Sequence, residues 1–164
     1  MIFLTVGTHE QSFDRVVKAV DEYAYQNKLA KNQVVIQLGY TNYIPQNCSY
    51  SKMLSYKDMD KLYKESEVII THGGPGSMFS PWKYGKKVIA VPRLSKFHEH
   101  VDDHQLHFCK LMEKEKKVIC IEEISELASA INNLNTNMNV QNNEYLPKTS
   151  QFVENFKRSL NEIL

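Results

Sequence analysis

The chain has 164 residues, of which 42% are hydrophobic, and a formal net charge of +1. This length fits one domain with a sizeable core, and the near-neutral charge gives no indication of nucleic-acid binding or of attachment to anionic lipid. No apolar run is long enough to span a membrane, and "MIFLTV" at the start is too short for a signal peptide. The three cysteines are widely spaced, which favours free thiols in a reducing, cytoplasmic setting.

Short apolar runs alternate with amphipathic stretches along most of the chain. The runs predict strands at 1–6, 33–39, 50–54, 67–71, 86–92 and 116–121. Helices are expected after Ser12 and Ser55, each placed to act as a cap, after the glycine loop "HGGPGS", near Asp102, and around 124–134. Because the strands are continuously apolar, both faces of their sheet are expected to be covered. The fold class is therefore α/β, with a doubly wound parallel sheet.

The end of the chain has a different character. The asparagine-rich segment "NNLNTNMNVQNN" favours a linker, placed at 135–148 between a main domain at 1–134 and a last helix at 149–164. That helix carries an apolar stripe consisting of Phe152, Phe156, Leu160 and Ile163. The stripe must be buried somewhere, either on another protein or on the sheet of this chain.

Three distinctive stretches follow predicted strands: "GTHEQ", "HGGPGS" and "PRLSKFHEHVDDHQ". In an open α/β sheet, ligands bind at the carboxyl ends of the strands. Glycines between a strand and a helix let backbone N–H groups approach an anion, and the helix N-terminus adds about half a positive charge. The second stretch therefore predicts a diphosphate cradle. The alternative is a tight turn that needs glycine for packing alone. The pattern is neither GxGxxG nor GxxxxGK[ST], which argues against a dinucleotide-binding loop and against a P-loop.

The third stretch is rich in histidine and acidic residues. Four of them have helical spacings of three and four that suit a zinc ion: His100, Asp103, His104 and His107. The alternatives are a solvated helix start or polar groups that bind ligand hydroxyls, for which the amide of Gln105 supplies both a donor and an acceptor. Arg93, just after the fifth strand, is a candidate for a phosphate or carboxylate or an ordinary surface arginine.

Four segments, "MIFLTVGTHEQSFDRVVKAVD", "THGGPGS", "GKKVIAVPR" and "EHVDDHQ", together resemble the C-terminal, donor-binding half of family 28 glycosyltransferases. The nearest resemblance is to the small soluble subunit of bacterial exopolysaccharide and capsule glycosyltransferases, whose two halves are separate chains. The resemblance covers roughly 1–131. It implies a Rossmann-like domain equivalent to the C-terminal half of a GT-B enzyme. It also implies a UDP-sugar donor, no metal or other cofactor, and a lipid-linked acceptor held by a membrane-anchored partner that brings this chain to the inner face of the plasma membrane.

The resemblance also implies residue roles, carried over by motif. Near the diphosphate it places Gly7, Thr8 and His9. In the main cradle it places His72, Gly73, Gly74, Gly76 and Ser77. Facing the donor sugar it places Asp103, His104 and Gln105. Near uracil it places Ser55, Tyr56 and Met59.

One position departs from the family pattern. Many relatives carry a glutamate that holds the ribose four residues after the last loop glycine, where this chain has Ser80 followed by Pro81. Glu99 is the candidate substitute, and Arg93 is expected to help stabilise the leaving diphosphate. The general base is expected from the partner, with His9 the one candidate in this chain.

The predicted function is thus that of the donor-binding, catalytic subunit of a two-component glycosyltransferase. Two alternatives stay open. One is a non-catalytic UDP-binding or stimulatory subunit of another transferase, which the missing ribose glutamate favours. The other is a metalloenzyme built on the histidine cluster.

Overall fold

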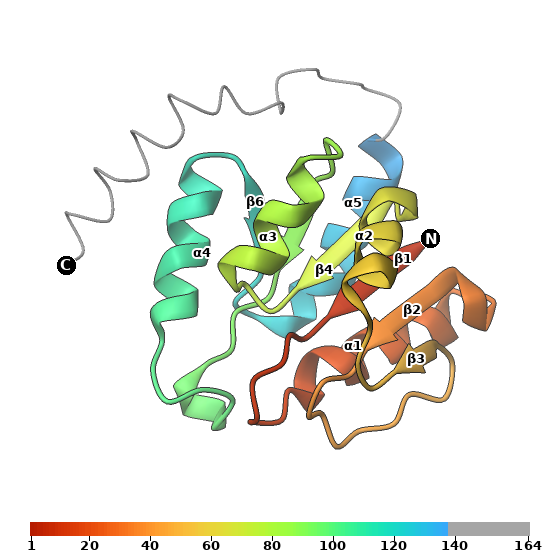
Figure 1. Cartoon of the computed structure of the whole chain (residues 1–164), viewed down its shortest axis with the longest axis horizontal. Helices are drawn as coiled ribbons and strands as arrows, with labels where there is room; N and C mark the ends of the chain where they lie inside the picture. Colours follow the sequence, from red (N-terminus) through yellow and green to blue (C-terminus); the bar gives the residue numbers. More distant parts are fainter. Residues whose placement is uncertain (138–164) are drawn as a thin grey trace.

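Six parallel strands form a single sheet in the order β3-β2-β1-β4-β5-β6 (Figure 1). The computed structural model describes residues 1–137. Its strands are β1 (Ile2–Thr5), β2 (Val34–Gln37), β3 (Ser49–Ser51), β4 (Val68–Thr71), β5 (Val88–Ala90) and β6 (Val118–Cys120). Every neighbouring pair is parallel, so the predicted doubly wound parallel sheet is confirmed.

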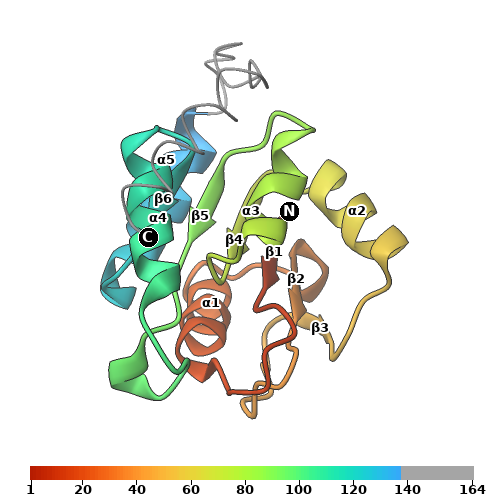
Figure 2. The same ribbon diagram turned by 60° about the vertical axis from the view of Figure 1, so that its left-hand side comes forward.

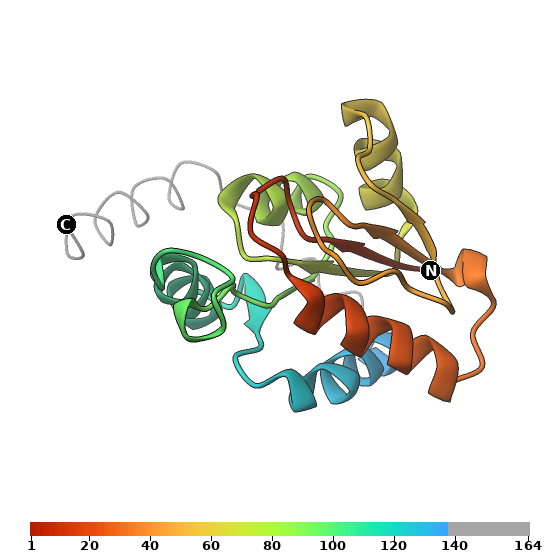
Figure 3. The same cartoon turned by 90° about the horizontal axis from the view of Figure 1, so that it is seen from below.

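Helices cover both faces of this sheet (Figure 3). On one face lie α1 (Asp14–Gln26) and α5 (Leu127–Asn137), and on the other lie α2 (Tyr56–Glu65), α3 (Pro75–Trp82) and α4 (His104–Lys114). Three short 3₁₀ turns complete the described chain: η1 (Lys31–Gln33), η2 (Ser95–Phe97) and η3 (Ile124–Glu126). Because helices pack against both faces of the sheet, the strands carry apolar side chains on both sides.

The two faces of the sheet carry separate cores. Leu4 and Ile70 point into the core shared with α1 and α5, whereas Phe3 and Ile69 point into the core shared with α2, α3 and α4. All four side chains are fully buried, which stabilises the fold by about 2 kcal/mol each. Alternation along each strand therefore fixes which residues meet which helices.

The two predicted helix caps have different outcomes. The prediction for Ser55 is confirmed, because its hydroxyl oxygen accepts a hydrogen bond from the Asp58 amide at 3.1 Å. The prediction for Ser12 is wrong, because α1 begins at Asp14 with Phe13 at the cap position. The Ser12 hydroxyl instead donates to the Asp14 carboxylate at 2.5 Å. Asp14 takes the place beside the positive helix end that an acidic side chain favours.

The last described helix continues past the predicted domain boundary at 134. Ile131 and Leu134 are buried against the rest of the core, and the Tyr23 hydroxyl donates to Oδ1 of Asn132 at 2.7 Å. These contacts hold α5, which ends at Asn137, against the rest of the domain. The remainder of the predicted linker and the predicted helix at 149–164 lie outside the described residues.

Candidate functional site

The connections from β1 and β4 leave the sheet in opposite directions. The chain runs from β1 through α1 to β2 on one side, and from β4 through α3 to β5 on the other. Such a switch point opens a crevice at the carboxyl ends of the two strands. The loops after β1 and β4, which carry "GTHEQ" and "HGGPGS", therefore lie next to each other, as predicted.

A cavity of about 550 Å³ opens at this point, within the size range of small-molecule sites. Its lining includes many of the residues predicted for donor binding: Gly7, Thr8, Tyr56, Met59, His72, Gly74, Gly76 and Ser77. These come from two loops and from the facing helices α2 and α3, which pack against each other (Figure 2). The structure thus brings together residues from three separate sequence segments.

His72 lies between two glycines. A Cβ atom on Gly7 would come within 2.5 Å of the His72 ring, and one on Gly74 would overlap with its Nε2 atom. Burial, together with the nearby positive charge of Arg93, lowers the pKa of His72 to about 4. At neutral pH the ring is therefore uncharged and carries a single N–H, which has the Thr5 carbonyl as a partner, while the side chain lines the cavity.

The N-terminus of α3 opens onto the same cavity through Pro75, Gly76 and Ser77. Pro75 has no N–H, and the Gly76 amide lies in the first turn, where an α-helix provides no carbonyl partner. A Cβ atom on Gly76 would meet no atom within 4 Å, so packing does not require glycine there. A free amide beside a positive helix end is suited to an anion.

Gly73 has a different role from its neighbours. Its φ angle is +83°, and a Cβ atom would come within 2.5 Å of the Cys109 sulfur on α4. Gly73 does not line the cavity. It therefore matches the packing alternative for the loop glycines, whereas Gly76 matches the anion-binding prediction.

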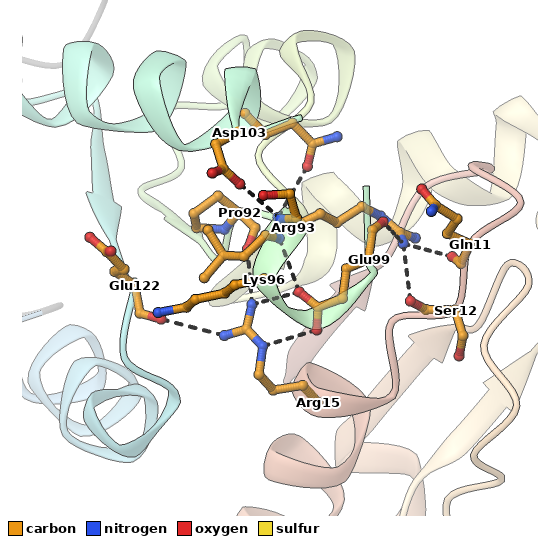
Figure 4. A network of polar contacts seen from close by, with 12 residues as sticks. Gln11, Ser12, Arg15, Pro92, Arg93, Lys96, Glu99, Asp103 and Glu122 are labelled. Carbon is orange, nitrogen blue, oxygen red and sulfur yellow. Dashed lines mark hydrogen bonds and ion pairs between the residues drawn. The ribbon is translucent and has the colours of Figure 1, made fainter. Parts of the chain in front are cut away.

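Arg93 does not occupy the position predicted for it. The side chain is fully buried, and its guanidinium donates to the carbonyl oxygens of Gln11 at 2.7 Å, Val6 at 3.0 Å and Glu99 at 3.1 Å (Figure 4). A fourth, longer bond reaches the Ser12 carbonyl. Because these bonds use both terminal nitrogens, Arg93 holds the loop after β1 in place and is not directed at a phosphate in the cavity.

Glu99 also differs from its predicted role as the ribose ligand. Its carboxylate accepts from Nε of Arg15 at 3.0 Å and from Nη2 of Arg15 at 2.9 Å, in a two-point ion pair (Figure 4). It also accepts from the Leu94 amide at 3.1 Å. Glu99 is buried and does not line the cavity. Its partners join α1 to the loop after β5, which is a structural role.

The residues predicted to face the donor sugar lie at the start of α4, outside the cavity lining. The Asp103 carboxylate accepts from the Ser95 amide at 2.8 Å, and Oε1 of Gln105 accepts from the Arg93 amide at 3.2 Å. The His104 side chain is largely exposed. Only the glycine loop separates this group from the cavity, because Gly73 packs directly against α4.

His9 joins two loops beside the cavity without lining it. Its ring lies 4.6 Å from the ring of His100, measured between centroids, and its Nε2 atom is 3.0 Å from Oε1 of Gln11. Nδ1 of His100 in turn lies 3.1 Å from the Asp102 carboxylate. Within residues 1–137, no three His, Cys, Asp or Glu side chains come together as metal ligands. The zinc hypothesis therefore finds no ligand set in that range.

Five cavity residues were missed by the sequence interpretation: Thr5, Gln37, Leu54, Asp60 and Tyr63. Pro75 belongs to the predicted cradle, and Ser80 lies at the position of the family's ribose glutamate. Thr5 and Gln37 end neighbouring strands, and the Thr5 hydroxyl donates to Oε1 of Gln37 at 2.8 Å. Polar residues at the ends of otherwise apolar strands were the available signal. Asp60 lies on a helix face, where it resembles any solvated acidic residue.

A parallel sheet of this strand order, with a cavity at its switch point beside a helix N-terminus, defines the class of Rossmann-like α/β domains. The family model named "Glycosyltransferase family 28 C-terminal domain" matches residues 1–163. The chain belongs to this family, as the motifs had indicated.

Two solved glycosyltransferases have similar structures. One is CalG4, the calicheamicin glycosyltransferase, with a TM-score of 0.62 and 13% identity over 99% of this chain and 40% of its own. The other is the glycotransferase of kitacinnamycin, with a TM-score of 0.58 and 16% identity over 81% of this chain and 34% of its own. The chain thus spans well under half of either protein.

No curated protein matches it. No helix among residues 1–137 has the length and apolar character needed to cross a membrane.

Proposed function

We propose that this chain is the donor-binding, catalytic subunit of a two-component glycosyltransferase that moves a sugar from a UDP-sugar to a lipid-linked acceptor in exopolysaccharide or capsule synthesis. The observation that carries the proposal is the cavity at the open N-terminus of α3, walled by the neutral ring of His72. Family membership supports the transferase assignment. The matched region covers 34% and 40% of the two solved glycosyltransferases, and our proposal assigns the acceptor-binding half to a partner chain.

The proposed donor lies along the cavity in three parts. The diphosphate binds the Gly76 amide and the first turn of α3, beside the uncharged ring of His72. The nucleoside extends toward α2, where Leu54, Met59 and Tyr63 provide an apolar wall. The sugar passes the glycine loop toward Gln105, whose NH₂ group remains for a hydroxyl because its oxygen accepts from the Arg93 amide.

The proposed reaction is attack of an acceptor hydroxyl on the anomeric carbon. The bond from that carbon to the diphosphate oxygen breaks, and UDP leaves with the bonding electrons. Preorganised N–H groups and the helix end stabilise the negative charge that develops on the leaving group, and we propose no metal or other cofactor. The hydroxyl proton goes to a base that we place on the partner, with His9 as the candidate in this chain.

The acceptor side requires a partner. We propose a membrane-anchored subunit equivalent to the N-terminal half of the enzyme, which holds the lipid-linked acceptor. This chain is then cytoplasmic and peripheral at the inner face of the plasma membrane. The segment 149–164, outside the described residues, is our candidate for docking because of its apolar stripe.

A thermal-shift panel tests the donor assignment. UDP should raise the melting temperature in EDTA, whereas ADP and GDP should have little effect, because a ligand at 100 times its Kd stabilises the native state by about 2.7 kcal/mol. A shift that appears only with magnesium contradicts the metal-free mechanism. An equal response to all three nucleotides contradicts the assignment to UDP.

The alternative is a non-catalytic, UDP-binding or stimulatory subunit, which is favoured by Ser80 at the cavity wall in place of a carboxylate. Co-expression with the proposed membrane-anchored subunit separates the two functions. Transfer of radiolabelled sugar to lipid in membranes that contain both chains supports the catalytic subunit. UDP binding without transfer supports the alternative.

A further inference from the structure

The wall of the cavity formed by α2 combines apolar side chains with one charge. Among the described residues that line the cavity, Asp60 is the only carboxylate. It lies on the same helix as Met59 and Tyr63, which are suited to a flat, weakly polar nucleobase. A carboxylate beside such a surface accepts hydrogen bonds from hydroxyl groups.

Two neighbours fix the orientation of this carboxylate. Oδ1 of Asp60 forms an ion pair with Nζ of Lys83, and Oδ2 accepts from the Tyr84 hydroxyl at 2.5 Å. Both partners follow α3, so they tie the end of that helix to α2. These hydrogen bonds, with Lys83 contributing most, lower the pKa of Asp60. The group is therefore ionised at neutral pH and acts as an acceptor only.

The carboxylate retains acceptor capacity for a ligand. Its two oxygens offer about four lone-pair positions, and one contact on each oxygen is described above. The side chain is 32% exposed, so a ligand in the cavity can reach it. An ion pair this exposed adds little to stability, so its clearest effect is to hold the carboxylate at the cavity wall.

The opposite wall provides no competing carboxylate. Ser80 lies one turn after Gly76 along α3 and also lines the cavity. A nucleoside that leaves a diphosphate at Gly76 and extends toward α2 passes between Ser80 and Asp60. The part of a nucleoside nearest to the diphosphate is the ribose, which carries two vicinal hydroxyl donors.

We propose that Asp60 accepts hydrogen bonds from the ribose hydroxyls of the nucleotide donor and makes the site selective for ribonucleotides over their deoxy analogues. This assignment rests on the proposed function, because it uses the diphosphate position at α3. The proposal assigns the ribose contact to Asp60 on α2. Glu99 does not make this contact, because its carboxylate is held in a buried ion pair with Arg15.

The experiment compares UDP with 2′,3′-dideoxy-UDP by titration calorimetry. The wild-type protein should bind UDP at least tenfold more tightly, because hydrogen bonds to a charged acceptor are stronger than those between neutral groups. Asp60→Asn should bring the ratio of the two affinities close to one, by weakening UDP and leaving the dideoxy analogue nearly unchanged. Lys83→Gln is the matched control, because it removes the same ion pair but keeps the carboxylate, which the Tyr84 hydroxyl still orients, so its ratio should stay well above that of Asp60→Asn.

Several outcomes overturn the assignment. They are a wild-type protein with no preference for UDP, an Asp60→Asn variant that keeps the preference, and a Lys83→Gln variant that loses it as fully as Asp60→Asn. Failure of both nucleotides to bind the wild-type protein overturns the proposed function itself and the ribose contact with it. Circular dichroism of each variant verifies its fold, which we expect to be intact because both side chains are at the surface.

Discussion

Gly76→Ala separates the two explanations for the glycine loop. Gly74→Val, the more obvious choice, does not, because any Cβ atom at Gly74 overlaps with the His72 ring and disturbs the protein with or without a ligand. At Gly76 the added methyl group meets no atom within 4 Å. It extends into open space beside the first-turn amide, which is where we place the diphosphate.

The expected changes have opposite signs. Alanine in place of glycine near a helix start should stabilise the fold by about 0.5 kcal/mol, because the unfolded chain loses conformational freedom. For a chain of this size, that raises the melting temperature by about 2 °C. UDP affinity should fall at least tenfold, since the methyl group prevents phosphate oxygens from reaching the amide at hydrogen-bond distance.

Differential scanning fluorimetry with and without UDP measures both quantities on one sample. A variant that is more stable without ligand and responds weakly to UDP supports a phosphate at the first turn of α3. Unchanged UDP affinity in the stabilised variant would falsify that placement. A lower melting temperature without ligand would show that Gly76 is needed by the backbone after all.

Three further predictions concern His72, Arg93 and Gln105. Burial lowers the pKa of His72 from 6.5 to about 4, so the imidazole takes up a proton more readily in the unfolded chain than in the folded protein. The contribution of the neutral ring to the free energy of unfolding is therefore complete above pH 6.5 and declines as the pH falls toward 4. Urea unfolding should show a loss of about 2 kcal/mol between pH 7 and pH 5 that is absent in His72→Asn, and an equal loss in both proteins contradicts the burial argument. Arg93→Met should destabilise the fold by about 3 kcal/mol in the same assay, since buried carbonyl groups lose their donor, and a stable variant defective only in UDP binding would restore the phosphate role. Gln105→Ala should weaken a UDP-sugar more than UDP in calorimetry, and equal losses would remove Gln105 from the sugar.

Motifs at strand ends predicted the positions of the loops after β1 and β4 better than those of the residues after β5. Loops that follow parallel strands meet at one edge of the sheet whatever the details of packing, so Gly7, Gly76 and Ser77 could be placed near one another in advance. The residues after β5 could not, because Arg93 and Glu99 are polar in sequence and yet buried. Partners distant in the sequence explain that burial: Gln11 is 82 residues from Arg93, and Arg15 is 84 residues from Glu99.

The sequence by itself determined the order of strands and helices, the family and the place of the glycine loop after β4, because each depends on local periodicity or on residues that are adjacent in the chain. The tertiary structure decided which polar residues face the cavity. Arg93 and Glu99 are directed into the protein by carbonyl groups and an arginine from the start of the chain, while Asp60 is directed to the cavity wall by the end of α3. Hydrogen-bond partners distant in sequence set these directions, so only the packed fold reveals them.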